Sequence, residues 1–265
     1  MLSAEPESSA QPESSAQPQV VLALDLPSGG RVRTLWTAPA PTASGGEGRG
    51  WVWLQHGFTR SGADLAGLAG LLADAGYAVV RPDIPSFRPT RSMHDARWLT
   101  EVALTVARAV DVGIPQVRGV RAAGAWSLVG HSAGAAVAVH VAACLDARHR
   151  DEGVASVVLL DPVDTVGGLL AAALPGAPLG TVHACRPSRC NRHGATVRAL
   201  AGQGWPVVEH LGLAHPDPER IPASGCAEDV PDAPAWLGAV CGRPGSPQDV
   251  ADLASQVRAD LAAMR

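Results

Sequence analysis

Short apolar runs alternate along this chain with longer segments in which apolar residues recur at helical spacing. The short runs are rich in Val, Leu, Ala and Trp, as is typical of strands buried on both faces, and they span residues 51–55, 77–80, 125–129, 157–160 and 205–211. Between them, Leu65, Leu68 and Leu72 share one helical face, and a second such pattern covers residues 98–109. This alternation predicts an α/β fold, a doubly wound and mainly parallel sheet with helices on both faces.

Turn and cap signals mark the ends of several elements. Two segments, 20–26 and 32–36, flank a Pro-Ser-Gly-Gly turn and predict an early hairpin. Gly76 suits the left-handed end of a helix over residues 64–75, and Ser246 opens the last helix with a capping pattern. A chain of 265 residues forms one such domain with an ample core.

Residues 1–19 form a polar tail built on a repeat. Pro-Glu-Ser-Ser-Ala-Gln occurs at 6–11 and again at 12–17. A Pro-rich segment without aromatic residues buries too little apolar surface to offset the entropy of ordering, so we expect a disordered tail before a single domain over residues 20–265. The tail also lacks the basic start and apolar core of a secretory signal, which predicts a cytoplasmic protein by default.

The strongest chemical signal is the pentapeptide Gly-His-Ser-Ala-Gly at residues 130–134. It follows an apolar run and precedes small apolar residues at 135–139, as a strand, a sharp turn and a helix require. The flanking glycines let the chain pass the turn without clashes, and the strained serine stands exposed at the sheet edge. Ser132 is therefore the candidate nucleophile. The alternative is an ordinary glycine-rich turn that contains a serine.

A second signal lies upstream, where His-Gly-Phe at residues 56–58 follows the buried run 51–55. Serine hydrolases of this layout bind the oxyanion with two backbone N–H groups. One belongs to the residue after the nucleophile, and the other comes from the loop after an earlier strand. The backbone amides of Ala133 and Phe58 are the candidates for these two roles.

The acid should follow the nucleophile in the chain, and the histidine should follow the acid. No Asp or Glu occurs at residues 165–208, so the acid must lie earlier. Asp161 and Asp164 follow the apolar run 157–160, at the strand end where catalytic groups gather in open α/β sheets. We take Asp161 as the acid and Asp164 as the reserve. The alternative for Asp161 is a turn residue before Pro162.

Four histidines follow the acid: His183, His193, His210 and His215. His215 is favoured as the base because it lies in the loop that leaves the last expected strand, where a side chain can be aimed. His210 lies within that strand and is the alternative. His131 precedes the acid and is expected to pack beneath the serine turn.

Substrate-binding residues are less clearly marked. The loop 85–94 follows a strand on the catalytic side, and Phe87 and Met93 within it are expected to line an acyl pocket. The alternative is an ordinary surface connection. The Pro-rich stretch 216–247 is too short for a lid domain, and it either folds over the site or packs on the domain.

Composition excludes several kinds of chemistry. The net charge of −4 with scattered arginines argues against nucleic acid as a partner. The chain contains no lysine, which excludes Schiff-base and pyridoxal chemistry, a Ser-Lys dyad and a phosphate-loop lysine. No transmembrane run, cofactor or metal site is expected, and a small-molecule ester is the expected partner.

The five cysteines cannot all pair. Cys144 falls in the helix after the serine turn and is expected to be a free core thiol. Cys185 with Cys190, and Cys226 with Cys241, are closely spaced pairs that an oxidising compartment would bridge. Bridged loop cysteines would indicate export in place of a cytoplasmic location.

Together these motifs resemble the chlorophyllase group of α/β-hydrolases and its bacterial chlorophyllase-like and cutinase-like relatives. The resemblance extends over about residues 51–215 and rests on residues 56–58, 130–132, 161–163 and 185–193. It implies a triad of Ser132, Asp161 and a late histidine, and substrates with a bulky apolar part. The chain departs from the group at Ala133, where chlorophyllases commonly have arginine, and at Ala-His-Pro-Asp in 214–217, where they have a Gly-His-Met-Asp step. These departures do not support chlorophyll itself as the substrate.

The sequence thus predicts a serine carboxylic-ester hydrolase that acts through an acyl-enzyme. Acyl transfer to an alcohol or a thiol uses the same residues and is the second hypothesis. A non-catalytic binding protein on a hydrolase fold is the third, since a fold alone does not prove activity.

Overall fold

The computed structural model describes residues 19–40, 48–88, 90–113, 125–148, 153–164, 168–233, 238 and 240–263. The two repeats of the polar tail lie outside the described residues, so disorder of the tail stays a prediction. Gln19, which the sequence placed in the tail, is the first residue of strand β1 (Gln19–Asp25).

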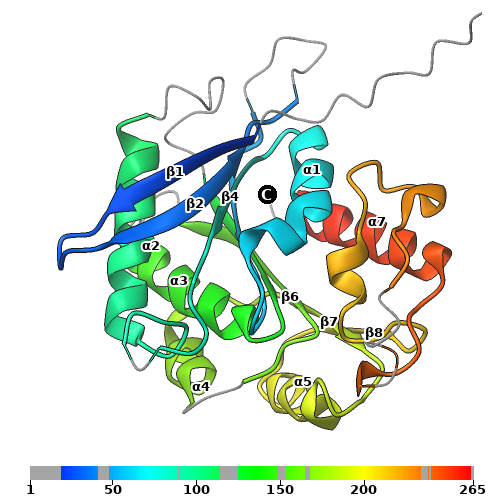
Figure 1. Cartoon of the computed structure of the whole chain (residues 1–265). Coiled ribbons are helices and arrows are strands. Elements are labelled where there is room, and N and C mark those ends of the chain that lie inside the picture. Colours follow the sequence, from blue (N-terminus) through cyan, green and yellow to red (C-terminus); the bar gives the residue numbers. More distant parts are fainter. Residues whose placement is uncertain are drawn as a thin grey trace, which may run out of the picture.

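An eight-stranded sheet runs through the molecule in the order β1-β2-β4-β3-β5-β6-β7-β8 (Figure 1). From β4 to β8 in this order all neighbours are parallel, whereas β2 (Arg31–Thr37) pairs in antiparallel register with β1 and with β4. The other strands are β3 (Trp51–Gln55), β4 (Ala78–Pro82), β5 (Trp126–His131), β6 (Val154–Leu160), β7 (Thr181–Cys185) and β8 (Val207–His210). The expected hairpin and the mainly parallel sheet are confirmed.

Helices cover both faces of this sheet (Figure 1). α1 (Ala66–Asp74) and α7 (Pro247–Ala263) bury their apolar residues against one face. The other face is covered by α2 (Ala96–Asp111), α3 (Gly134–Arg148), α4 (Leu169–Ala173) and α5 (Ala195–Ala201). The doubly wound arrangement predicted from the sequence is therefore confirmed.

The pleat explains why the central strands are apolar at successive positions. In β3, Trp51 and Trp53 belong to the core under α2 and α3, whereas Val52 and Leu54 belong to the core under α1 and α7. Successive side chains of a strand point to opposite faces, so a strand covered on both faces needs apolar residues throughout.

Two glycines let α3 begin directly above the ends of β3 and β5. A Cβ atom on Gly134 would lie 2.6 Å from the carbonyl oxygen of Gln55 and closer still to that of His56. A Cβ atom on Gly130 would lie 2.6 Å from the carbonyl oxygen of Gly134. Close-packed interiors do not accommodate atoms at such distances. The turn between β5 and α3 therefore requires glycine at both positions, and Ser132 lies between them.

Gly134→Ala is expected to lower the free energy of unfolding by about 1–3 kcal/mol, because the added methyl group meets backbone atoms that cannot turn away. Gly202→Ala is the matched control, since Gly202 has φ −63° and an added Cβ there meets ordinary contacts from 3.4 Å. Urea unfolding followed by circular dichroism compares the two variants. Equal midpoints for both variants and the parent protein would show that this turn tolerates a side chain.

Candidate active site

Ser132 lies in the turn between β5 and α3 with a left-handed backbone, at φ 56°. Its amide donates to the carbonyl of Leu160 at 3.0 Å, and its carbonyl accepts from the amide of Val163 at 3.0 Å. Such a φ is strained for a residue with a side chain and persists only where the surroundings fix it. Here Leu160 at the end of β6 and Val163 just after it hold the serine backbone through its amide and its carbonyl.

The structure brings Ser132, His215 and Asp161 into one hydrogen-bonded line. Nε2 of His215 lies 2.9 Å from Oγ of Ser132, and Nδ1 lies 2.6 Å from Oδ2 of Asp161. Asp161 directly follows β6, and His215 lies in the loop after β8. A carboxylate can only accept a hydrogen bond, so Nδ1 of His215 carries the hydrogen. Nε2 then has a lone pair that can accept the proton of the serine.

Asp161 is fully buried and is held by several donors besides His215. The backbone amide of Cys185 donates to Oδ1 at 3.1 Å. The side-chain amide of Asn191 lies 3.2 Å from Oδ1 and 3.0 Å from Oδ2. Buried carboxylates need such partners, because desolvation penalises an unpaired charge.

The sequence did not indicate that Asn191 bonds to Asp161. Its own Oδ1 accepts from the amide of Ser188 at 2.8 Å, and its Nδ2 also donates to the carbonyl of Arg186 at 3.0 Å. These bonds fix the amide with its donor side toward Asp161. The position of Asn191 beside Cys190 and before a helix gave only a weak signal.

The pKa of His215 lies below its ordinary value of 6.5. Burial is the main cause, the hydrogen bond with Asp161 opposes it, and the charge of His131 lowers the pKa further. A lowered pKa keeps the imidazole neutral near neutral pH, which is the form that accepts a proton.

The alternative candidates for the base and the acid, His210 and Asp164, have other surroundings. His210, in β8, lies 3.0 Å from Nδ1 of His183, whose Nε2 lies 2.8 Å from Asp260 of α7. Asp164 lines a separate cavity of about 250 Å³, and burial raises its pKa. His210 and Asp164 therefore do not join the line at Ser132.

The loop after β3 lies against Ser132. A Cβ atom on Gly57 would lie 2.9 Å from Cβ of Ser132, so the loop that carries the Phe58 amide packs directly against the serine. The loop is held by His56, whose Nδ1 donates to the carbonyl of Gly57 at 2.9 Å while Nε2 accepts from the amide of Ile84 at 3.0 Å. Within the described part of the chain, the amides of Phe58 and Ala133 donate to no protein group.

Phe87 and Met93 occupy different surroundings. Phe87 is 76% exposed and packs edge-on against Phe58, with ring centroids 4.6 Å apart. Met93 is 2% exposed in the core, and its sulfur lies 3.8 Å from Oγ of Ser86. The expectation that Met93 lines an acyl pocket is therefore wrong for this structure, because the loop 85–94 folds that side chain inward.

The serine opens into a cavity of about 290 Å³. Phe58, Val163 and Val240 give it apolar walls, and Arg60 and Glu219 give it a charged side; the remaining lining residues are Gly57, Thr59, His131, Ser132, Cys190, His215, Pro216 and Cys241. Glu219, in the short helix η4 (Asp217–Arg220), was not singled out from the sequence. No pattern in the sequence relates it to the loop that carries Arg60.

A disulfide joins Cys190 to Cys241 in the wall of this cavity. Cys144, Cys185 and Cys226 are free. The expected pairs, Cys185 with Cys190 and Cys226 with Cys241, are therefore wrong. Short spacing along the chain did not predict the pairing. Cys185 ends β7 and is buried beside Asp161, whereas the loop that carries Cys190 turns toward the C-terminal segment.

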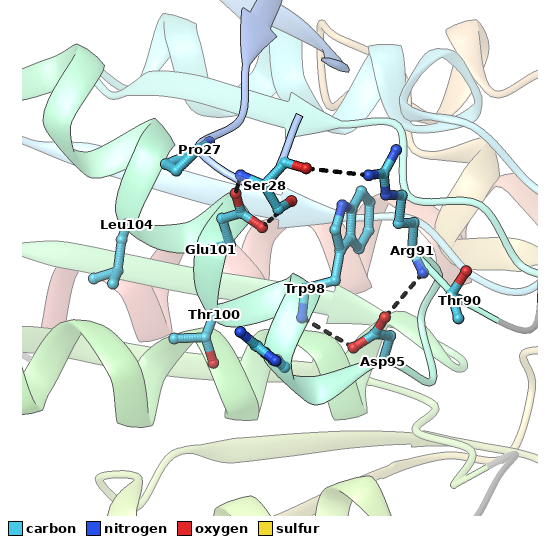
Figure 2. Close-up of a pocket in the computed structure, with 10 residues that line it drawn as sticks. Pro27, Ser28, Thr90, Arg91, Asp95, Trp98, Thr100, Glu101 and Leu104 are labelled. Carbon is cyan, nitrogen blue, oxygen red and sulfur yellow. Dashed lines mark hydrogen bonds between the residues drawn. The ribbon is translucent and has the colours of Figure 1, made fainter. Parts of the chain in front are cut away.

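A larger cavity, of about 650 Å³, lies away from the serine, between the β1–β2 turn and α2 (Figure 2). Its polar groups bond to one another: both the amide and the hydroxyl of Ser28 bond to Glu101, and Arg91 donates to the carbonyl of Ser28 at 3.3 Å. Asp95 caps α2 by accepting from the amide of Trp98 at 3.0 Å. Size alone therefore does not mark the site, and we assign the chemistry to the smaller cavity at Ser132.

Among the residues that the structure describes, no group of three or more His, Cys, Asp or Glu side chains is arranged to hold a metal ion. No helix in the same part of the chain has the length and apolar character needed to span a bilayer.

Comparison with known proteins identifies the fold through solved structures. No protein-family model matches the chain, and no curated protein sequence matches it. A carboxyl esterase 2 from the fungus Tuber melanosporum is similar with a TM-score of 0.61 and 13% identity, covering 96% of this chain and 89% of that one. An esterase from Pyrobaculum calidifontis has a TM-score of 0.57 and 17% identity, covering 94% and 87%.

A dienelactone hydrolase from Anabaena variabilis is similar as well, with a TM-score of 0.56 and 16% identity over 91% of this chain and 96% of that one. At such identities the likeness establishes the fold. The chain has the α/β-hydrolase fold, which it shares with these esterases and the dienelactone hydrolase.

Removing the disulfide is expected to destabilise the protein. The Cys190–Cys241 bond closes a loop of 51 residues, and the lost restriction of the unfolded chain corresponds to about 4 kcal/mol. Replacing both cysteines with serine should lower the urea midpoint accordingly. Cys226→Ser is the control, because Cys226 is free and exposed, and it should leave the midpoint unchanged.

A thiol titration of the denatured, unreduced protein checks the pairing itself. The three free cysteines of the structure should react. Reaction of all five, or a midpoint that the double variant does not alter, would contradict this disulfide.

Proposed function

We propose that this protein is a serine carboxylic-ester hydrolase. The observation that carries the proposal is the continuous line from Oγ of Ser132 through the ring of His215 to the carboxylate of Asp161, with distances of 2.9 and 2.6 Å. Nucleophile, base and orienting acid within hydrogen-bond reach form the arrangement that activates a serine hydroxyl. The similar esterase folds agree with this proposal but do not establish it.

In the proposed reaction, Nε2 of His215 takes the proton of Ser132 as Oγ attacks the ester carbonyl carbon. Asp161 holds the ring through Nδ1 and stabilises the imidazolium that forms. The amides of Phe58 and Ala133 donate to the oxyanion of the tetrahedral intermediate. His215 then gives its proton to the departing alcohol, and water, activated by the same histidine, cleaves the acyl-enzyme.

The size of the cavity supports a substrate whose acyl group lies inside the cavity and whose alcohol part lies outside it. A volume of about 290 Å³ lies at the small end for ligand pockets, so it fits a short acyl group. Val240 lines the cavity and is 57% exposed, and Phe87 lies exposed beside Phe58. We propose that these side chains contact a bulky apolar alcohol part that extends out of the cavity.

The disulfide favours an oxidising compartment for this protein. Disulfides persist in exported proteins and are rare in the reducing cytosol. We therefore propose export in place of the cytoplasmic location expected from the tail.

Purified protein is expected to hydrolyse short p-nitrophenyl esters, and Ser132→Ala should lower kcat by roughly 10⁴ to 10⁶ because the nucleophile is lost. Ser127→Ala is the control, since Ser127 lies in β5 as a buried strand residue away from the line. A fluorophosphonate probe should label the parent and Ser127→Ala but not Ser132→Ala. Undiminished turnover by folded Ser132→Ala would exclude Ser132 as the nucleophile.

The base is tested by a matched pair of histidine variants. His215→Ala should lose most of the activity, whereas His210→Ala should retain it and lose stability, because His210 bonds to His183. In the parent, kcat/KM should rise with pH through an ionisation below 6.5 and then level off, since burial lowers the pKa of His215 and only its neutral form accepts the proton. An acid limb above 6.5, or loss of activity in His210→Ala alone, would contradict His215 as the base.

A further inference from the structure

His131 lies between two oxygen acceptors and beside the proposed base. Its Nε2 lies 2.8 Å from the backbone carbonyl oxygen of His215, and its Nδ1 lies 3.3 Å from Oε1 of Glu219. The side chain is 2% exposed, and its ring centroid lies 5.1 Å from that of His215. The sequence predicted only packing beneath the serine turn, but this residue also lines the cavity.

The two acceptors constrain the protonation of His131. A neutral imidazole has one N–H group, so in either tautomer the lone pair of the other ring nitrogen lies near one of these oxygens. Only the imidazolium carries a hydrogen on both ring nitrogens. The Nδ1 contact is too poorly aligned for a good hydrogen bond, so Glu219 acts on the ring mainly as an ion-pair partner.

The charges around the ring favour the imidazolium. Glu219 is itself paired with Arg60, whose Nε lies 3.0 Å from each carboxylate oxygen. Burial lowers the pKa of His131, but the contacts with Glu219, the hydrogen bond to the His215 carbonyl and the charge of Asp161 together raise it above its ordinary value. Burial raises the pKa of Glu219, and contacts with His131 and Arg60 lower it to below its ordinary value. These are the charged groups that face the ring from the loop after β3, the end of β6 and η4.

We propose that His131 is a positioning residue for His215, that it carries a proton in the working enzyme, and that Glu219 and Arg60 hold its charge in place. The proposal rests on the ester-hydrolase function and adds a second histidine to that site. The hydrogen bond to the His215 carbonyl fixes the loop that carries the base. The positive charge disfavours a second imidazolium 5.1 Å away, so it keeps His215 neutral to lower pH.

Nuclear magnetic resonance of the protein labelled with nitrogen-15 in histidine tests the protonation directly. We expect both ring nitrogens of His131 to be protonated at about pH 7, with a pKa above the ordinary 6.5. In Glu219→Gln the ring should become neutral at the same pH, because its anionic partner is gone. A neutral His131 in the parent protein overturns the proposal.

Kinetics of two substitutions separate the charge from the hydrogen bond. His131→Gln retains an N–H group near the Nε2 position without the charge, so the acid limb of kcat/KM should move up by about 0.5 to 1 pH unit with a plateau within about threefold of the parent. His131→Leu removes both, so kcat should also fall about tenfold while KM stays within about threefold. His193→Gln, at an exposed histidine outside this network, is the control for both measurements.

An acid limb that stays in place or moves down in His131→Gln overturns the proposal, and so does a rise in KM without a fall in kcat in His131→Leu. Should both His131 variants fail to fold, the resonance titration of the parent against Glu219→Gln decides alone. A parent protein that hydrolyses no ester would overturn the proposed function, and the titration would still decide whether His131 is protonated against Glu219.

Discussion

The tight turn between β5 and α3 is the constraint on which the site depends. The helix begins so close to the ends of β3 and β5 that only glycine fits two residues before and two residues after the serine, and Ser132 takes a left-handed backbone at φ 56°. The bonds of its amide and carbonyl to the end of β6 make that conformation the stable one. Ala133 follows Ser132 in the same turn, so one steric constraint positions both the proposed nucleophile and the proposed oxyanion donor.

Buried polar groups that satisfy one another build the rest of the site. Asp161 is fully buried and receives bonds from His215, the Cys185 amide and the Asn191 side chain. Because an unpaired buried charge is costly, each of these donors also restricts where the acid can point. Asn191 follows Cys190 of the disulfide, so the cross-link that walls the cavity also restrains the segment that holds the acid.

Two buried histidines in one cavity have pKa values shifted in opposite directions. Burial lowers the pKa of His215, and its hydrogen bond with Asp161 does not fully compensate, whereas at His131 the contacts with Glu219, the His215 carbonyl and Asp161 together outweigh burial. Desolvation acts on both rings, so the difference comes from the neighbouring groups, because carboxylates and a carbonyl raise the pKa of His131 while the charge of His131 lowers the pKa of His215 further. One histidine is thereby suited to accept a proton, and the other is suited to keep one.

The sequence alone determined the early hairpin, most strands of the parallel sheet, the serine turn and the chain order of Ser132, Asp161 and His215, but it did not mark β7 (Thr181–Cys185). Those features follow from local causes: the pleat, the helical period, glycine sterics, and the rule that parallel strands end at one edge of a sheet. The tertiary structure alone decided that Asn191 holds Asp161, that Glu219 pairs with Arg60 and His131, that Cys190 bonds to Cys241, and that Met93 points into the core. Each of these depends on the path of loops between distant segments, such as the 159 residues that separate Arg60 from Glu219. No local pattern of residues specifies a loop path, because it is set by how the whole chain packs.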